Sequence, residues 1–293
     1  MSGWSLIIHG GAKAITPALR QANRDGLKAA VAAGAAVLRA GGAALDAAEQ
    51  AIRVLEDLPT FNAGYGSVLN ADGAVEMDAA LMDGRDLRIG AVGAIQGVRH
   101  PVSVARALMA ETPVLLVGEG AHRFASEAGL ELCDPGVMIA PDRDGVGAGV
   151  DTVGCVVRDR DGNVVAGTST GGLAGKRPGR VGDSPLPGCG LYAQVGIGGV
   201  SVSGDGDRIA RVLLAAEVMR ALGGGWTPSA AALIAMKAME TVGGEAGAIV
   251  LDRDGRLGCA HNSPNFAMGG AWEARPEPAA WLHETEFHEA TDV

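Results

Sequence analysis

The most distinctive chemical setting in this sequence belongs to a threonine at the start of a predicted strand. Thr152 opens the apolar segment 152–157, and residues 134–150 before it hold two prolines and four glycines without periodicity. This preceding segment is the best linker candidate in the chain. If the chain were cut after Asp151, the new α-amine of Thr152, with a pKa of roughly 7.7–8.0, could serve as general base for its own hydroxyl. A threonine at a strand start is usually only a β-branched strand former, so the neighbouring residues must decide.

A predicted hairpin brings a second threonine beside Thr152. The apolar segments 153–157 and 164–168 flank residues 159–163, which contain an Asp-Gly turn signal. Folding this hairpin places Thr170 next to Thr152. The Asp-Arg-Asp-Gly tetrad in the turn recurs at 252–255, but neither copy begins a calcium loop because no Glu closes a twelve-residue loop.

Two opposite charges follow on a loop that glycines and prolines stiffen. Arg180 and Asp183 lie three residues apart within the segment 178–185. Such a pair suits the α-carboxylate and α-ammonium of an amino acid, because a guanidinium grips a carboxylate through two parallel hydrogen bonds. The alternative is a local salt bridge, which contributes little when exposed.

Two other motifs match known patterns poorly. Residues 167–171 fit G-x-S-x-G, with His261 or His283 available for a triad, but the Gly-rich residues 172–179 cannot form the helix that a serine-hydrolase elbow needs. Residues 188–193 fit a loose dinucleotide fingerprint, although prolines occupy the place of its strand.

The remaining periodicity predicts alternating helices and strands. Their order indicates an α/β sandwich with a largely antiparallel sheet and helices packed outside. The predicted helices are 24–39, 44–57, 102–110, 121–128, 207–222 and one beginning at Thr227, and the remaining predicted strands are 6–8, 73–78, 89–95, 114–117, 248–251 and 257–260.

Composition excludes several classes of function. The 293 residues carry a net charge of −10 and 47% hydrophobic residues, which indicates an acidic globular protein. No basic run could neutralise phosphates, so we expect no nucleic-acid or membrane partner. The longest uncharged apolar run, 29–38, is too short to span a bilayer. The N-terminus lacks a leader pattern and the four scattered cysteines suit free thiols, so we expect a cytoplasmic protein.

Several of these motifs together resemble a known family. Residues 151–154, 168–172 and 178–185 are similar to the plant-type asparaginase and isoaspartyl peptidase family of N-terminal-nucleophile hydrolases, and segments 8–12, 61–69 and 76–80 agree. The resemblance extends from about Leu6 to Trp272. It implies a four-layer αββα sandwich in which 1–293 is a single domain made as a precursor. Self-cleavage would yield an α subunit, 1–151, ending in the linker 134–151, and a β subunit, 152–293, and two such heterodimers would associate as (αβ)2.

The resemblance also implies roles for individual residues. It implies no cofactor and no metal in the reaction, although a structural sodium ion on backbone carbonyls of the loop Leu55 to Tyr65 is typical of the family. Carried over by position, Thr152 is the nucleophile, cleavage falls between Asp151 and Thr152, and Thr170 supports the Thr152 hydroxyl. Arg180 holds the substrate's α-carboxylate, Asp183 holds its α-amine, and Gly206 lies beside that amine. Ser203 and Gly204 bind the oxyanion, and Asn62 lies near the nucleophile.

Three departures from the family pattern bear on specificity. Asp151 stands where Gly is usual, as in glycosylasparaginases and taspases; Ser203 replaces Thr; and Ala174-Gly175 replaces a polar pair. The expected activity is hydrolysis of β-aspartyl dipeptides and L-asparagine, both small-molecule substrates. Two alternatives stay open: a glycosylasparaginase-like amidohydrolase, and an inactive Gly-rich protein that binds a small molecule.

Overall fold

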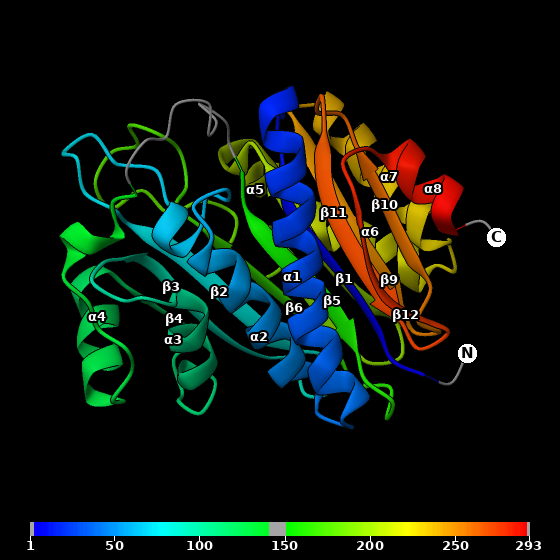
Figure 1. The fold of residues 1–293 in the computed structure, drawn as a ribbon, viewed down its shortest axis with the longest axis horizontal. Helices are drawn as coiled ribbons and strands as arrows, with labels where there is room; N and C mark the ends of the chain where they lie inside the picture. Colours follow the sequence, from blue (N-terminus) through cyan, green and yellow to red (C-terminus); the bar gives the residue numbers. More distant parts are fainter. Residues whose placement is uncertain (1–2, 141–150, 292–293) are drawn as a thin grey trace.

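Two stacked β-sheets form the centre of the computed structural model, which describes residues 3–140 and 151–291 (Figure 1). Neighbouring strands are antiparallel except β3 and β4, which are parallel. The larger sheet has the order β12 (Arg275–Trp281), β11 (Phe266–Trp272), β1 (Ser5–Ala12), β5 (Val153–Arg158), β6 (Val164–Thr170), β2 (Met77–Asp83), β3 (Arg88–Ile95) and β4 (Leu115–Val117). The smaller sheet has the order β10 (Leu257–His261), β9 (Ala246–Asp252), β8 (Gly198–Gly204) and β7 (Leu191–Gln194).

Helices cover the outer faces of both sheets. On the larger sheet lie α1 (Arg20–Arg39), α2 (Ala44–Asp57) and α3 (Pro101–Leu108), and on the smaller sheet lie α5 (Gly206–Val212), α6 (Leu214–Gly223) and α7 (Pro228–Glu240) (Figure 1). Two further helices, α4 (Gly118–Glu127) and α8 (Glu284–Thr291), pack at the two ends of the larger sheet. The predicted αββα sandwich is confirmed.

The strands that carry Thr152 and Thr170 are buried on both faces. In β5, Val153, Cys155 and Val157 face the helices, whereas Val156 faces the smaller sheet. A strand covered on both sides must be apolar throughout rather than alternating. This burial fixes the register of β5 against its neighbours, and with it the position of Thr152.

The predicted hairpin of β5 and β6 forms with Val153 opposite Ser169. In its turn, Asp159 Oδ1 accepts hydrogen bonds from the backbone N–H groups of Asp161 and Asn163, at 3.1 and 2.9 Å. Asp252 makes the equivalent bonds in the turn between β9 and β10. Both tetrads are therefore turn-forming sequences.

Some predicted elements differ from the observed ones. The helix predicted over 207–222 is divided into α5 and α6 at Leu213, whose φ of 51° is left-handed. The strand predicted over 73–78 instead begins at Met77. Most of the predicted linker, residues 141–150, lies outside the described residues, and within its first part Pro135–Met138 forms a 3-10 turn. The four cysteines are free thiols, as predicted. Within the described residues, no helix has the length and apolarity required to cross a membrane.

Candidate active site

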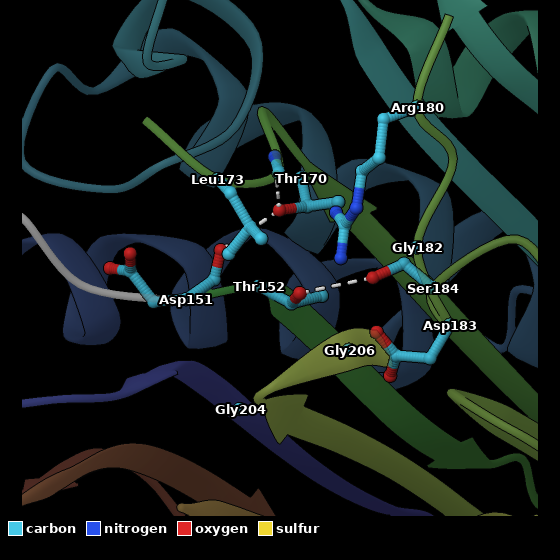
Figure 2. Close-up of a pocket in the computed structure, with 11 residues that line it drawn as sticks. Asp151, Thr152, Thr170, Leu173, Arg180, Gly182, Asp183, Ser184, Gly204 and Gly206 are labelled. Carbon is cyan, nitrogen blue, oxygen red and sulfur yellow. Dashed lines mark hydrogen bonds between the residues drawn. The ribbon is translucent and has the colours of Figure 1, made fainter. Parts of the chain in front are cut away.

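The Thr152 hydroxyl lies where the two sheets meet. Thr152 Oγ1 is 3.0 Å from Ser184 Oγ, on the loop that follows β6, and the two hydroxyls are hydrogen-bonded (Figure 2). The Thr152 N–H donates to Ser203 Oγ of β8 at 3.0 Å. Ser203 Oγ also accepts the N–H of Ala12, at 3.1 Å, so its own proton remains available to another acceptor. The loop after β6 and the smaller sheet therefore fix Thr152.

Two side-chain donors converge on the carbonyl of the Asp151–Thr152 peptide bond. Asn62 Nδ2 donates to Asp151 O at 3.0 Å and Thr170 Oγ1 donates to it at 2.8 Å. The Thr170 hydroxyl thus bonds to this carbonyl and not, as the resemblance had implied, to the Thr152 hydroxyl. The partner of the Thr152 hydroxyl is Ser184. Donors aimed at a carbonyl oxygen stabilise negative charge that develops there during nucleophilic attack.

The loop after α2 holds Asn62 in place. Its Oδ1 accepts the N–H of Val68 at 3.0 Å, and its Nδ2 also donates to Gly172 O at 2.8 Å. Backbone carbonyls converge within this loop, because those of Leu58 and Phe61 would both meet a Cβ on Gly66. Carbonyl oxygens suit hard cations, so the loop fits the structural sodium ion that the resemblance implies.

A small pocket joins Thr152 to the predicted substrate-binding residues. The pocket is narrow and partly open to solvent. Its lining residues are Asp151, Thr152, Thr170, Gly172, Leu173, Arg180, Gly182, Asp183, Ser184, Gly204 and Gly206 (Figure 2).

Arg180 enters the pocket with an ion-pair partner other than Asp183. Its Nη2 and Nε lie 2.8 and 3.2 Å from Asp207 Oδ1, at the start of α5. Asp207 is mostly exposed, whereas Arg180 is 16% exposed. The guanidinium is thus anchored on one side and faces the pocket on the other (Figure 2).

Asp183 supplies a buried carboxylate with unused hydrogen-bonding capacity. Within residues 3–140 and 151–291, its Oδ2 has no hydrogen-bond partner. Burial raises the pKa of Asp183 to about 7, although the positive charge of Arg180 acts in the opposite direction. A Cβ on Gly206 would collide with Asp183 Oδ1, so only glycine leaves this carboxylate accessible. A buried acceptor of this kind favours a cationic ligand.

A buried histidine lies behind Thr152. His9 Nε2 is 2.9 Å from Ser201 Oγ, and Ser201 donates its proton to Gly167 O, so Nε2 carries the proton of the imidazole. Burial lowers the pKa of His9 to about 3, which keeps the ring neutral. A Cβ on Gly154 would collide with both side chains, so the glycine two residues after Thr152 lets the sheets approach.

Several contacts in and around the site were not predicted. Ser184 lies in a predicted motif, yet nothing in the sequence marked it as the partner of Thr152. Two acidic residues hold the loop that carries Arg180. Asp78 of β2 accepts the N–H of Gly182 at 3.1 Å, and Glu76, directly before β2, accepts the N–H of Gly179 at 3.1 Å. Lys13, at the end of β1, forms a buried ion pair with Asp151.

The G-x-S-x-G segment does not form a nucleophile elbow. Ser169 lies within β6, is buried, and donates to Glu56 Oε1 at 2.7 Å on the helix side of the sheet. His261 bonds to Ser263 instead, with Nδ1 2.9 Å from the Ser263 carbonyl. Among the described residues, no group of three or more His, Cys, Asp or Glu side chains could hold a metal ion.

The sequence matches one family model and several curated relatives over most of its length. A family model described as asparaginase matches residues 2–146 and 140–276. An isoaspartyl peptidase of Salmonella typhimurium is 39% identical over 296 residues, covering 91% of this chain and 94% of that protein. An isoaspartyl peptidase/L-asparaginase of Danio rerio is 39% identical, covering 97% and 95%, and one of Xenopus laevis is 41% identical, covering 85% and 86%. Because the family model spans most of the sequence and these relatives align over most of it, the chain belongs to the asparaginase family.

Proposed function

We propose that this protein is an N-terminal-nucleophile hydrolase that cleaves β-aspartyl dipeptides and L-asparagine. The observation that carries the proposal is one small pocket that holds the Thr152 hydroxyl, the Arg180 guanidinium and the Asp183 carboxylate, whose Oδ2 has no hydrogen-bond partner among the described residues. These groups match a hydrolysable side-chain carbonyl, an α-carboxylate and an α-ammonium, in that order. The names of the relatives support the same substrates.

Self-cleavage would generate the active form. Thr152 Oγ1 attacks the carbonyl carbon of Asp151, and the hydrogen bonds from Asn62 and Thr170 stabilise the oxyanion. The C–N bond breaks as the nitrogen of Thr152 takes up the proton that the attacking hydroxyl loses, which leaves an ester between Asp151 and Thr152 Oγ1. Water then hydrolyses this ester, giving residues 1–151 and 152–293.

Substrate hydrolysis would use the freed α-amine. The amine takes the hydroxyl proton as Thr152 Oγ1 attacks the β-carbonyl carbon, while the Ser203 hydroxyl and the Gly204 N–H stabilise the oxyanion. The C–N bond then breaks, and the leaving amine departs with the proton from the α-ammonium. Water hydrolyses the aspartyl ester to release L-aspartate, with no cofactor. A sodium ion in the loop that carries Asn62 would brace that loop without entering the reaction.

We further propose that two cleaved heterodimers associate as (αβ)2. Support comes from the family resemblance alone. Light scattering on the purified, cleaved protein should give the mass of two complete chains, and a mass of one chain would refute this assembly.

A substrate panel tests the proposed function against its alternatives. Cleaved enzyme should hydrolyse β-aspartyl dipeptides and L-asparagine and should leave N-glycosylated asparagine intact. N-acetylated β-aspartyl substrates should be poor, because Asp183 would face a neutral amide. Preferential release of a glycosylamine from N-glycosylated asparagine would favour a glycosylasparaginase. A cleaved protein without any turnover would favour the inactive binding protein.

A further inference from the structure

A buried ion pair ties the end of β1 to the residue before Thr152. The side chains of Lys13 and Asp151 are only 6% and 3% exposed. Besides Asp151, the Lys13 ammonium lies 3.5 Å from the carbonyl of Thr60 and 5.9 Å from the centre of the Phe61 ring. Among the described residues, Asp151 is the one carboxylate that pairs with it.

Cleavage after Asp151 would leave this lysine in need of an anion. Asp151 would then be a chain end, no longer bonded to Thr152. Its departure frees Lys13 together with Asn62 and Thr170, the two donors that hold its carbonyl. An ammonium buried without a counter-ion is costly, so the vacated space favours a ligand with a negative charge.

The space vacated by Asp151 adjoins the position of the leaving group. In the proposed reaction, the α-amine of Thr152 protonates the departing nitrogen, so that nitrogen must lie within hydrogen-bond reach of the amine. In the uncut chain the Asp151 carbonyl carbon is bonded to this same Thr152 nitrogen. The leaving group therefore enters the place where Asp151 lay.

The leaving amino acid has a carboxylate at the required reach. In Asp151, a short run of covalent bonds separates the backbone carbonyl carbon from a side-chain carboxylate oxygen. In a β-aspartyl dipeptide, the same number of bonds separates the scissile carbonyl carbon from an α-carboxylate oxygen of the leaving residue. The α-carboxylate of the leaving residue therefore has a reach comparable to that of the Asp151 side chain, which pairs with Lys13 in the uncut chain.

We propose that the space vacated by Asp151 is the leaving-group subsite, in which Lys13 binds the α-carboxylate of the released amino acid. This inference rests on the proposed function. It makes dipeptides with a free C-terminal carboxylate the preferred substrates, over β-aspartyl amides and over L-asparagine, whose leaving group is ammonia and carries no carboxylate.

The test compares two substrates that differ only in this carboxylate. We would measure kcat/KM for β-aspartyl-leucine and β-aspartyl-leucinamide with wild-type enzyme, with Asp151→Gly, and with Lys13→Met combined with Asp151→Gly. Asp151→Gly is the matched parent, because Lys13→Met alone would leave the buried Asp151 carboxylate unpaired in the precursor. Intact mass fixes the concentration of cleaved enzyme in each sample.

The expected result is a preference for the free acid that depends on Lys13. Wild-type and Asp151→Gly enzymes should favour the acid over the amide by about 10-fold or more, as one charged hydrogen bond provides. The added Lys13→Met change should reduce that ratio by a similar factor, chiefly through KM for the acid. A general loss of structure would lower both rates and leave their ratio intact.

Two other results would overturn the inference. Equal turnover of the acid and the amide by wild-type enzyme refutes it even if the Lys13 variant fails to mature. An acid preference that survives Lys13→Met assigns the carboxylate to another group. Both results leave the proposed function standing, whereas absence of turnover with either dipeptide and with L-asparagine in cleaved wild-type enzyme would refute the function itself.

Discussion

Arg180 divides its guanidinium between a protein carboxylate and the pocket. Nε and Nη2 bind Asp207, which leaves the remaining donors free to face a substrate carboxylate. A lysine ammonium is a single point charge and cannot reproduce this planar, two-sided arrangement.

We therefore expect Arg180→Lys to lower kcat/KM for β-aspartyl dipeptides by about 10–100-fold, equivalent to about 1.4–3 kcal/mol. Steady-state kinetics on cleaved enzyme measure this. Arg177→Lys is the matched control, because Arg177 is exposed on the same loop and outside the pocket. Unchanged kinetics in Arg180→Lys would remove Arg180 from carboxylate binding.

Asp183 makes ligand binding dependent on pH. Its carboxylate is buried and its pKa is raised to about 7, so about half of the molecules carry a neutral Asp183 at neutral pH. A substrate ammonium requires the ionised form, and protonation therefore weakens binding as pH falls through 7.

The affinity for L-aspartate, the reaction product, should fall by up to about tenfold per pH unit below pH 7. Isothermal titration calorimetry of cleaved enzyme between pH 5.5 and 7 measures this slope. Asp183→Asn should bind more weakly at pH 7 and should flatten the slope. A slope of the same size in Asp183→Asn would place the titrating group elsewhere.

At the scale of elements, a protonated carboxyl joins α2 to β6. Glu56 Oε1 accepts hydrogen bonds from Ser169 Oγ at 2.7 Å and from the Val102 N–H at 3.0 Å. Burial raises the pKa of Glu56 to about 8, so this side chain is mainly neutral at pH 7. The contact places the end of α2, and the Asn62 loop after it, against the strand that carries Thr170.

This burial should make stability fall as pH rises. Between the ordinary glutamate pKa and about 8, the folded state binds the proton more tightly than the unfolded state, so the free energy of unfolding decreases with pH in that range. Glu56→Gln removes the titration, and its stability should rise relative to the parent as pH increases from 5 to 8. Each unit of pKa shift corresponds to about 1.4 kcal/mol.

Urea denaturation measures this difference best in the Thr152→Ala background, in which a single uncut chain keeps the transition simple. Parallel stability curves for Glu56→Gln and its parent over pH 5–8 would show that Glu56 is already ionised in the folded protein.

Local sequence predicted some of these elements better than others. The hairpin of β5 and β6 was predictable because an Asp-Gly turn and two apolar runs fix its register, and this register places Thr170 opposite Thr152. Strand β7 has only four residues, and in β8 the alternation is confined to 200–203 between flanking glycines, so neither strand had a comparable signal. The break at Leu213 also had none, because leucine normally continues a helix. Lys13 and Ser184 reach the site from other segments, and Glu56 reaches Ser169 from α2, so only tertiary packing brings these contacts about.

At the scale of the whole molecule, the two halves of the chain share the larger sheet. Strand β5 pairs with β1, and β6 pairs with β2, so strands from residues 152–293 lie between strands from residues 3–140. Cutting the chain at Asp151 breaks none of these pairings.

The two fragments should therefore stay together after cleavage. We expect them to co-elute in size-exclusion chromatography under native conditions and to separate only in denaturant, because separation would expose buried strands on both sides. Elution of a free 152–293 fragment from native buffer would contradict this arrangement of the halves.

Thr152 becomes an N-terminal nucleophile only if the chain is cut before it, so the mass of the purified protein is the decisive measurement. Intact-mass spectrometry of wild-type protein should show two species, residues 1–151 and 152–293, while Thr152→Ala should remain one full-length, inactive chain. Wild-type protein that stays full length and still hydrolyses β-aspartyl dipeptides would rule out an N-terminal nucleophile, because Thr152 would then have no free amine.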